Sequence, residues 1–306
     1  MLGAKGALTI ALFTWATGCA HSWTEERDRP TCLVLSAGGP TGLAHIGALE
    51  AVHDEHLPVD CITGTSMGAL VGSLFATAPE EPLRQRYVRL LDAYRAESQR
   101  EAARNAMLGG AVGAVIAGVV TGGSATLPLL VGAAAGAVAA AEATRPLSYP
   151  RFARVLAAYE ERQVIESLTL PFVTFFQQRQ GTGLALVVAR SGPVAQAVSR
   201  SIANPFIFAD FDPVNAGYVD PGGDRLLAVP VEETCRAFPR ARLLAINASG
   251  QASVWSAKMN CPVLEVNVGA PAAPAAALAG NNEAFAQIVA RGYEATRFAL
   301  QADRRR

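Results

Sequence analysis

The chain has 306 residues, of which 51% are hydrophobic and 17% are charged. A charged share well below the usual ~25%, with so many apolar residues, excludes a mainly disordered protein and allows a large core. Lysine plus arginine and aspartate plus glutamate number 26 each. Without a net positive charge to attract nucleic acid, we expect no nucleic-acid partner.

The first 18 residues are predicted to be a signal peptide. Lys5 gives a short positive region, and residues 7–16 form an apolar core that is too short to span a bilayer. Small residues lead up to Cys19 and form a cleavage site. We therefore expect an exported protein in which residues 19–30 link the new N-terminus to the fold.

Cys19 is the candidate lipidation site. The run Thr17-Gly18-Cys19 resembles a bacterial lipoprotein signal, in which the cysteine is acylated, although Ala16 stands where leucine is usual. Several acyl chains on one cysteine hold a protein firmly to a membrane. Ala20, rather than aspartate, follows the cysteine. By the same resemblance, this favours a protein anchored in the outer membrane and facing the periplasm. An ordinary cleaved signal, with an incidental cysteine, remains the alternative.

Two strand–turn–helix units follow and predict the fold class. Residues 31–36 form a short apolar run that ends at a glycine-rich turn, and residues 43–53 carry apolar side chains at helical spacing. Residues 59–63 form a second apolar run, which is followed by a second glycine turn and an apolar helix to about residue 77. Strand, glycine turn and helix, repeated, predict an α/β protein with a parallel sheet.

Residues 105–141 differ from the charged helix predicted over 79–105. They contain no charged residue and no histidine, and glycines recur in pairs four residues apart. Such pairs let helices pack closely, so we expect a Gly/Ala-rich helical hairpin that contacts the membrane or mediates self-association. Each half would be roughly 23 Å long, short of a bilayer core of ~30 Å. A soluble, tightly packed hairpin or a poorly ordered insertion is the alternative.

The alternation of strands and helices resumes after residue 145. We expect strands at 171–178, 183–189, 242–246 and 263–268, a helix at 193–201, and a short strand that ends at Asp220. The predicted catalytic domain covers 31–268, and 269–306 supply a linker and a closing amphipathic helix.

Four cysteines remain in the predicted mature chain after Cys19. They are Cys32, Cys61, Cys235 and Cys261. An exported chain can pair its cysteines, but these spacings fit no metal or redox motif and include no Cys-x-x-Cys. We therefore expect four free or buried thiols and no metal site.

The segment Gly64-Thr65-Ser66-Met67-Gly68 fits the G-x-S-x-G nucleophile elbow. It has the required context, with a predicted strand before it and a predicted helix after it. Gly64 and Gly68 flank the serine because this turn is strained and neighbouring chain passes within contact distance. Ser66 is therefore the candidate nucleophile.

No histidine can complete a Ser–His–Asp triad of the α/β-hydrolase order, in which the histidine follows the serine. The four histidines, which all precede Ser66, are His21, His45, His53 and His56. A carboxylate must therefore act as the base if Ser66 is a nucleophile.

Four segments, in this order, resemble the patatin-like phospholipase family: LVLSAGGPTGLAHIGAL, GTSMGALVGSLFA, RSGPVAQAVSRSIANPFIF and YVDPGG. The resemblance covers about residues 31–268, with 105–141 as an insertion. It implies a three-layer α/β/α sandwich with a mostly parallel sheet. It also implies a Ser–Asp dyad that hydrolyses acyl esters of lipids, with no metal or organic cofactor.

The resemblance also implies the roles of individual residues. Ser66 matches the nucleophile, Asp220 the general base, and the loop around Gly38 and Gly39 the oxyanion hole. The proline that follows these glycines has no N–H, so the oxyanion donors come from the two glycines or from Thr41.

The chain departs from the family pattern at three positions. Ala37 replaces the first glycine of the loop, and Thr41 replaces a basic residue, which weakens the expectation that a phosphate is held there. Pro221 separates the aspartate from the glycine that usually follows it, so Asp224 is the alternative base. A catalytically inactive relative that binds membrane or oligomerises, and an acyltransferase, remain alternative functions.

Overall fold

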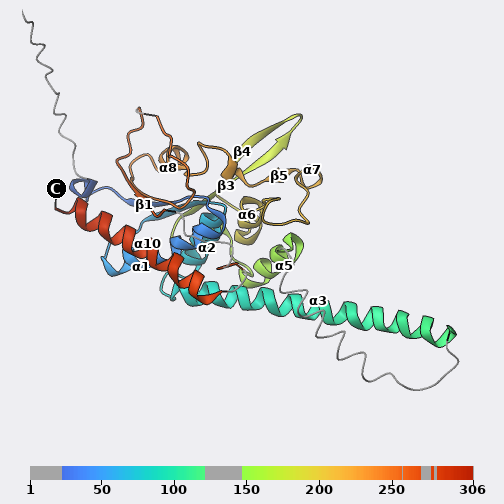
Figure 1. Ribbon diagram of the computed structural model, residues 1–306. Coiled ribbons are helices and arrows are strands. Elements are labelled where there is room, and N and C mark those ends of the chain that lie inside the picture. The colour runs from blue at the N-terminus through green and yellow to red at the C-terminus, as the bar shows by residue number, and fades with distance from the viewer. Residues whose placement is uncertain (1–22, 121–146, 257, 270–276, 279–280, 306) are drawn as a thin grey trace, which may run out of the picture.

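A seven-stranded sheet forms the centre of the molecule (Figure 1). This computed structural model describes residues 23–120, 147–256, 258–269, 277–278 and 281–305. The strands are β1 (Thr31–Leu35), β2 (Cys61–Thr65), β3 (Phe172–Gln180), β4 (Gly183–Ala189), β5 (Tyr218–Val219), β6 (Arg242–Asn247) and β7 (Val263–Asn267).

Helices connect these strands. The α-helices are α1 (Ala44–Asp54), α2 (Met67–Thr77), α3 (Leu83–Val120), α5 (Tyr149–Tyr159), α6 (Val194–Ser201), α7 (Pro213–Ala216), α8 (Val231–Ala237) and α10 (Asn282–Asp303). The short 3₁₀ helices are η1 (Trp23–Glu26), η2 (Gly39–Leu43), η3 (Ile165–Ser167) and η4 (Pro221–Gly223).

The sheet order is β4-β3-β2-β1-β6-β7, and β5 also pairs with β3. Strands β3, β2, β1, β6 and β7 are parallel, whereas β4 and β5 are antiparallel to β3. This confirms the predicted α/β class with a mostly parallel sheet. The carboxyl ends of the parallel strands therefore share one edge of the sheet, where such folds place their ligand sites.

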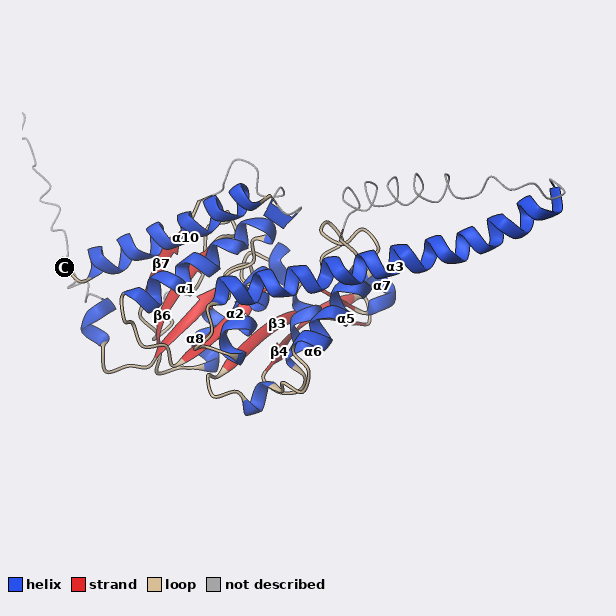
Figure 2. Ribbon diagram, turned by 90° about the horizontal axis from the view of Figure 1, so that it is seen from below, coloured by secondary structure: helices blue, strands red, loops and turns tan. Residues whose placement is uncertain are grey.

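The central strands are buried on both faces, so alternate residues enter two separate cores. Leu33 and Leu35 of β1 join the large core against α1, α2 and α10. Cys32 and Val34 join a smaller core against α8. Figures 1 and 2 show α1, α2 and α10 together on one side of the sheet. The three layers are thus present, with one face much thinner than the other.

Helix α10 is part of the thick layer. A side chain at Gly47 of α1 would lie 1.8 Å from the carbonyl oxygen of Val289, and one at Gly292 of α10 would lie 1.9 Å from that of Ala44. The two helices therefore cross backbone against backbone, and only glycine fits at these two positions. The closing helix expected after residue 282 thus packs into the core of the fold.

Helix α3 runs without a break from Leu83 to Val120. The charged helix predicted over 79–105 and the first half of the predicted hairpin therefore form one continuous helix, in which each glycine costs about 1 kcal/mol relative to alanine. Figure 2 shows its far end extending beyond the other elements. The second half of the predicted hairpin, residues 121–141, lies outside the described residues, as do the signal peptide and Cys19.

No described helix combines the length and apolar character needed to cross a bilayer. The described part of the chain also holds no cluster of His, Cys, Asp and Glu suited to a metal ion.

Two disulfides contradict the expectation of free thiols. Cys32 and Cys61 occupy paired positions on the adjacent strands β1 and β2, with their Cα atoms 4.5 Å apart. Cys235 of α8 bonds to Cys261, just before β7, across a Cα distance of 5.9 Å. These pairings depend on strand register and on the docking of α8, neither of which sequence spacing reveals. All four cysteines lie in the core beneath α8.

Candidate active site

Sheet register brings Ser66 and Asp220 together. β2 and β5 pair with the same edge of β3 and run toward each other along it. The last residue of β2 pairs with Phe175, and the last residue of β5 pairs with Gln177. The next residues along the two strands, Ser66 and Asp220, therefore meet at the single β3 position between them. Ser66 Oγ donates a hydrogen bond to Asp220 Oδ2 at 2.6 Å.

The turn that carries Ser66 is strained, as the motif predicts. Ser66 has φ 55° and ψ −122°, a left-handed backbone that is uncommon for a residue other than glycine. A side chain at Gly64 would lie 2.4 Å from the backbone of Gly68, and one at Gly68 would lie 2.4 Å from the carbonyl oxygen of Leu35. Both flanking glycines are therefore required by close backbone contact.

Asp220 is a buried carboxylate held by three donors. Its Oδ1 accepts from the Gly222 amide at 2.7 Å, and its Oδ2 accepts from Ser66 and, at 3.4 Å, from Asn204 Nδ2. Burial raises the pKa of Asp220, and the hydrogen bonds from Ser66, Gly222 and Asn204 oppose that rise. A raised pKa makes the ionised carboxylate a stronger base toward the serine hydroxyl.

The inserted proline leaves the aspartate in place. Pro221 begins the short helix η4, which turns the chain so that the amide of Gly222 reaches back to the Asp220 carboxylate. The alternative base, Asp224, faces elsewhere. Its Oδ2 accepts a hydrogen bond from Gln177 at 3.5 Å, and its Oδ1 accepts one from the backbone amide two residues further along the chain. Neither oxygen bonds to Ser66.

The glycine loop follows β1 at the same edge of the sheet. The Thr41 amide donates to the Gly38 carbonyl at 3.0 Å and is thereby occupied. Across the described residues, the amides of Gly38 and Gly39 donate to no protein acceptor. A side chain at Gly38 would lie 2.7 Å from the Ala248 carbonyl oxygen. Of the three predicted oxyanion donors, the two glycine amides are therefore the ones left free.

His45 is a structural residue. It is fully buried in α1, and its Nε2 lies 2.9 Å from the Ser36 carbonyl oxygen. Burial lowers the pKa of His45 to about 4, which keeps the ring neutral at pH 7. The neutral Nε2–H donates to the carbonyl, and the histidine makes no hydrogen bond to Ser66.

The last residue of α6 and the residues just after it hold Ser66 and Asp220, and no sequence pattern predicts this. Ser201 Oγ accepts a hydrogen bond from the Ser66 amide at 2.9 Å, and the Ala203 carbonyl accepts from the Asp220 amide at 2.9 Å. Asn204 donates to the Asp220 carboxylate. The segment RSGPVAQAVSRSIANPFIF carried part of the family resemblance, but nothing in its composition indicates which side chains face the site.

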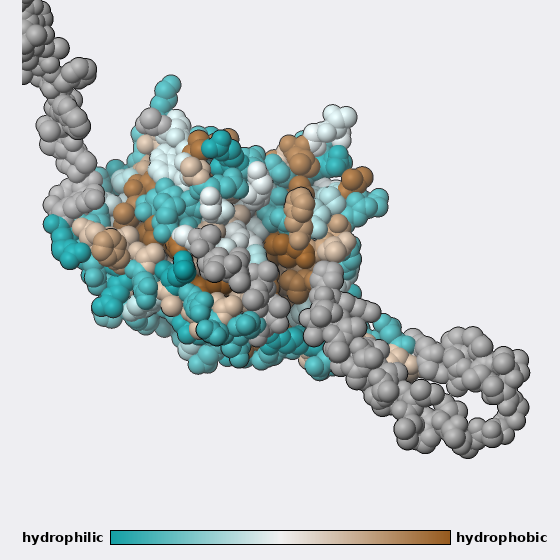
Figure 3. All heavy atoms as spheres, viewed as in Figure 1, coloured by the Kyte–Doolittle hydropathy of each residue, from teal (hydrophilic) through white to brown (hydrophobic). Residues whose placement is uncertain are grey.

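The dyad lies below the molecular surface. Ser66 is 2% exposed and Asp220 is 7% exposed. The loop beyond Asn204 carries Phe206, which is 98% exposed, and Ile207, whose Cδ1 would lie 3.6 Å from a side chain placed at Gly39. In Figure 3, apolar side chains gather over the end of the molecule that carries β4 and α7.

A strained serine on a strand–helix turn, bonded to a buried carboxylate beside a loop with two free amides, is the arrangement of a serine acyl hydrolase site. The family model described as patatin-like phospholipase matches residues 33–233. The chain therefore belongs to the patatin-like phospholipase family.

Two curated relatives match short parts of this chain. A patatin-like phospholipase domain-containing protein of Caenorhabditis elegans is 49% identical over 49 residues, which are 16% of this chain and 4% of the relative. Lysophospholipase NTE1 of Saccharomyces cerevisiae is 48% identical over 44 residues, which are 14% of this chain and 3% of the relative. The matches thus span only a few per cent of these relatives' own length.

Two solved structures align with most of the chain. The ExoU–SpcU complex of Pseudomonas aeruginosa aligns over 90% of this chain and 52% of its own, at 18% identity and a TM-score of 0.44. VipD from Legionella pneumophila aligns over 90% of this chain and 67% of its own, at 10% identity and a TM-score of 0.40.

Proposed function

We propose that this protein hydrolyses acyl esters of lipids, with Ser66 as nucleophile and Asp220 as general base. The observation that carries the proposal is the 2.6 Å hydrogen bond from Ser66 Oγ to a buried carboxylate. The patatin-like phospholipase family supports a lipid ester as the substrate, and so does the name lysophospholipase on a relative.

In the first half of the reaction, Asp220 accepts the Ser66 proton as Oγ attacks the ester carbonyl carbon. The negative charge that develops on the carbonyl oxygen is stabilised by the free amides of Gly38 and Gly39. Collapse of the tetrahedral intermediate breaks the ester bond. The leaving alcohol takes the proton from Asp220, and the acyl group remains on Ser66.

In the second half, Asp220 takes a proton from water, which attacks the acyl-enzyme carbonyl carbon. The same two amides stabilise the second oxyanion, and Asp220 returns the proton to Ser66 Oγ as the fatty acid leaves. An acyltransferase would use the same residues with an alcohol in place of water.

Exposed apolar side chains beside the site support an aggregated lipid as the physical form of the substrate. Phe206 is almost fully exposed and follows Asn204, which bonds to the base. Val214 in α7 is 65% exposed. A lipid surface can accept such side chains, whereas water does not favour them.

The experiment compares Ser66→Ala and Asp220→Asn with the wild type on a short-chain phospholipid. We expect each variant to lower turnover by about two orders of magnitude or more, because one lacks the nucleophile and the other the base. A fluorophosphonate probe should label the wild type and leave Ser66→Ala unlabelled. Folded wild-type protein that neither turns over ester nor takes up the probe would be a non-catalytic relative.

We also propose that Cys19 anchors the mature protein to the outer membrane, facing the periplasm. Two disulfides support export, since disulfides persist in oxidising compartments. We further propose that residues 105–141, which carry no charge, contact the same membrane or a second copy of the chain. The Cys19→Ser variant should leave the membrane fraction or stay unprocessed. Normal processing and fractionation of that variant would rule out the anchor.

A further inference from the structure

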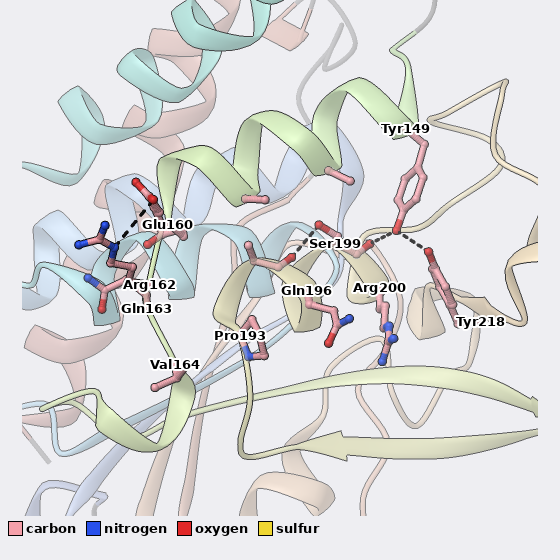
Figure 4. Close-up of a pocket in the computed structure, with 14 residues that line it drawn as sticks. Tyr149, Glu160, Arg162, Gln163, Val164, Pro193, Gln196, Ser199, Arg200 and Tyr218 are labelled. Carbon is pink, nitrogen blue, oxygen red and sulfur yellow. Dashed lines mark hydrogen bonds and ion pairs between the residues drawn. The ribbon is translucent and has the colours of Figure 1, made fainter.

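A cavity between α5 and α6 has no part in the chemistry proposed above. Its volume is about 460 Å³. Figure 4 shows Tyr149, Arg200 and Tyr218 at one end of it, and Arg162 and Gln163 at the other. The small side chains that leave this space open come from both helices and are Ala153, Ala157 and Ala195.

Arg200 supplies a cation at the tyrosine end. Its guanidinium carbon lies 5.4 Å from the ring centre of Phe176 and 5.5 Å from that of Tyr218. Among the described residues, no carboxylate lies within ion-pair distance of this guanidinium and no hydrogen bond occupies it. A guanidinium held by aromatic stacking, with its N–H donors free, is suited to bind phosphate oxygens in pairs.

The opposite end of the cavity disfavours an anion. Glu160 lies there, and its carboxylate is 3.8 Å from Arg86. Glu161 also lines this end and lies 3.8 Å from Arg162. Arg86 and Arg162 are thus each paired with a carboxylate. An anion that enters the cavity is therefore attracted toward Arg200.

Two tyrosines linked by hydrogen bonds lie beside Arg200. The Tyr149 hydroxyl lies 3.1 Å from the Ser199 carbonyl oxygen and 3.2 Å from Tyr218 Oη. The Ser199 carbonyl can only accept, so it takes the single Tyr149 proton, and Tyr218 donates to the Tyr149 oxygen. These two hydrogen bonds fix the tyrosine rings beside Arg200.

The cavity adjoins the supports of the dyad. Arg200 directly precedes Ser201, whose hydroxyl accepts the Ser66 amide. Tyr218 lies two residues before Asp220 on the chain that forms β5. A ligand bound to Arg200 at this end of the cavity therefore lies beside α6, which ends at Ser201, and beside β5, which leads into Asp220.

We propose that this cavity binds a phosphate-bearing ligand, with Arg200 holding the phosphate. The glycine loop carries Thr41 where the family usually has a basic residue, and Arg200 supplies a cation from another element. The ligand is either the head group of the lipid substrate or a separate phosphate ester. Binding does not require the Ser66 chemistry, so the proposal stands or falls separately from the proposed function.

The direct test is calorimetric titration of glycerol 3-phosphate into the full-length protein. We expect saturable binding that Arg200→Gln weakens by about tenfold or more, because hydrogen bonds to a charged group are lost. Ala153→Trp keeps the charge but fills the cavity, and should weaken binding similarly. Arg236→Gln, which removes an exposed charge on α8, should keep the wild-type affinity. Absence of saturable binding, or equal losses in the Arg200 and Arg236 variants, overturns the proposal.

Kinetics then identify the occupant. If the substrate head group fills the cavity, Arg200→Gln lowers the ratio of kcat/KM on dioctanoyl phosphatidylglycerol to that on dioctanoylglycerol by about tenfold or more. If a separate ligand fills it, glycerol 3-phosphate changes the wild-type rate on dioctanoylglycerol but not the rate of the variant. Either result supports the site. Failure of both esters to turn over would refute the proposed function, and the titration would still decide this proposal.

Discussion

The two members of the dyad are held by parts of the molecule that differ in construction. Ser66 follows β2, a fully buried strand in the middle of the sheet, and its turn is fixed by backbone-to-backbone contact at Gly64 and Gly68. Asp220 follows β5, a partly exposed strand of two residues, and is fixed mainly by hydrogen bonds. Ser66 is thus positioned by steric exclusion and Asp220 by a small polar network. We expect changes on the serine side to cost folding and changes on the aspartate side to cost activity.

The largest effect is expected from Gly68→Ala. Its new methyl group would lie 2.4 Å from the Leu35 carbonyl oxygen, so the elbow must move away from β1. We expect a loss of more than about 4 kcal/mol of unfolding free energy, measured by urea denaturation or seen as a loss of soluble protein. The matched control is Gly72→Ala in the same helix, where the methyl would meet only side chains at 3.4 Å or more. A stable Gly68→Ala protein would contradict steric positioning.

The next effect concerns the disulfide on the serine side. Replacing Cys32 and Cys61 by alanine removes the cross-link between β1 and β2, which closes a loop of 29 residues. We expect the unfolding free energy to fall by about 3 kcal/mol. The Cys235→Ala/Cys261→Ala pair, whose sequence separation is 26, should cost a similar amount. Because only the first pair joins the strands that carry the glycine loop and the elbow, only its loss should also lower ester turnover at denaturant concentrations where both variants are folded.

On the aspartate side, Gly222→Ala should impair activity more than stability. The added methyl would lie 2.7 Å from the Ala37 side chain and 3.0 Å from Asp220 Oδ1, which displaces the carboxylate. We expect kcat/KM for a short-chain ester to fall by about tenfold to a hundredfold, with the urea midpoint changed little. Gly223→Ala, where the methyl would meet nothing within 4 Å, is the neighbouring control. Equal activity in the two variants would show that Asp220 tolerates displacement.

The smallest effect is a shift in the pH profile of Asn204→Ala. The Asn204 amide lowers the pKa of Asp220, so its removal should raise that pKa further. A base must be ionised to act, and activity therefore falls as pH drops through this pKa. The acid limb of kcat/KM should move to higher pH, and Asn215→Ala, at an asparagine bonded to Asp212, should leave it in place. An unchanged acid limb would mean that the 3.4 Å contact has no electrostatic effect.

The serine side could be predicted from sequence because its constraints are local. The strand, the turn and the helix follow one another directly in the sequence. Steric contacts within and around the turn require glycine at positions 64 and 68 and favour Ser66 between them. Asp220 was assigned only through the family resemblance. Its approach to Ser66 depends on β5 pairing with β3, and a two-residue strand leaves almost no periodic signal.

Other features of the site also depend on long-range geometry. Thr41 was one of three candidate oxyanion donors, but the turn η2 occupies its amide. Ser201 gave no signal, because its role appears only when α6 packs beside the elbow. The disulfides likewise depend on which strands become neighbours, and Cys32 meets Cys61 only through the register of β1 and β2.

The disulfide pattern has a consequence for the order of events during biosynthesis. Each bridge joins cysteines that are consecutive among the four in the folded domain, Cys32 with Cys61 and Cys235 with Cys261. Four cysteines allow three pairings. In a chain that is translocated from its N-terminus, the first pair emerges long before the second, so oxidation in order of emergence forms the native set without reshuffling. Acylation of Cys19 would also withdraw the one earlier thiol able to compete.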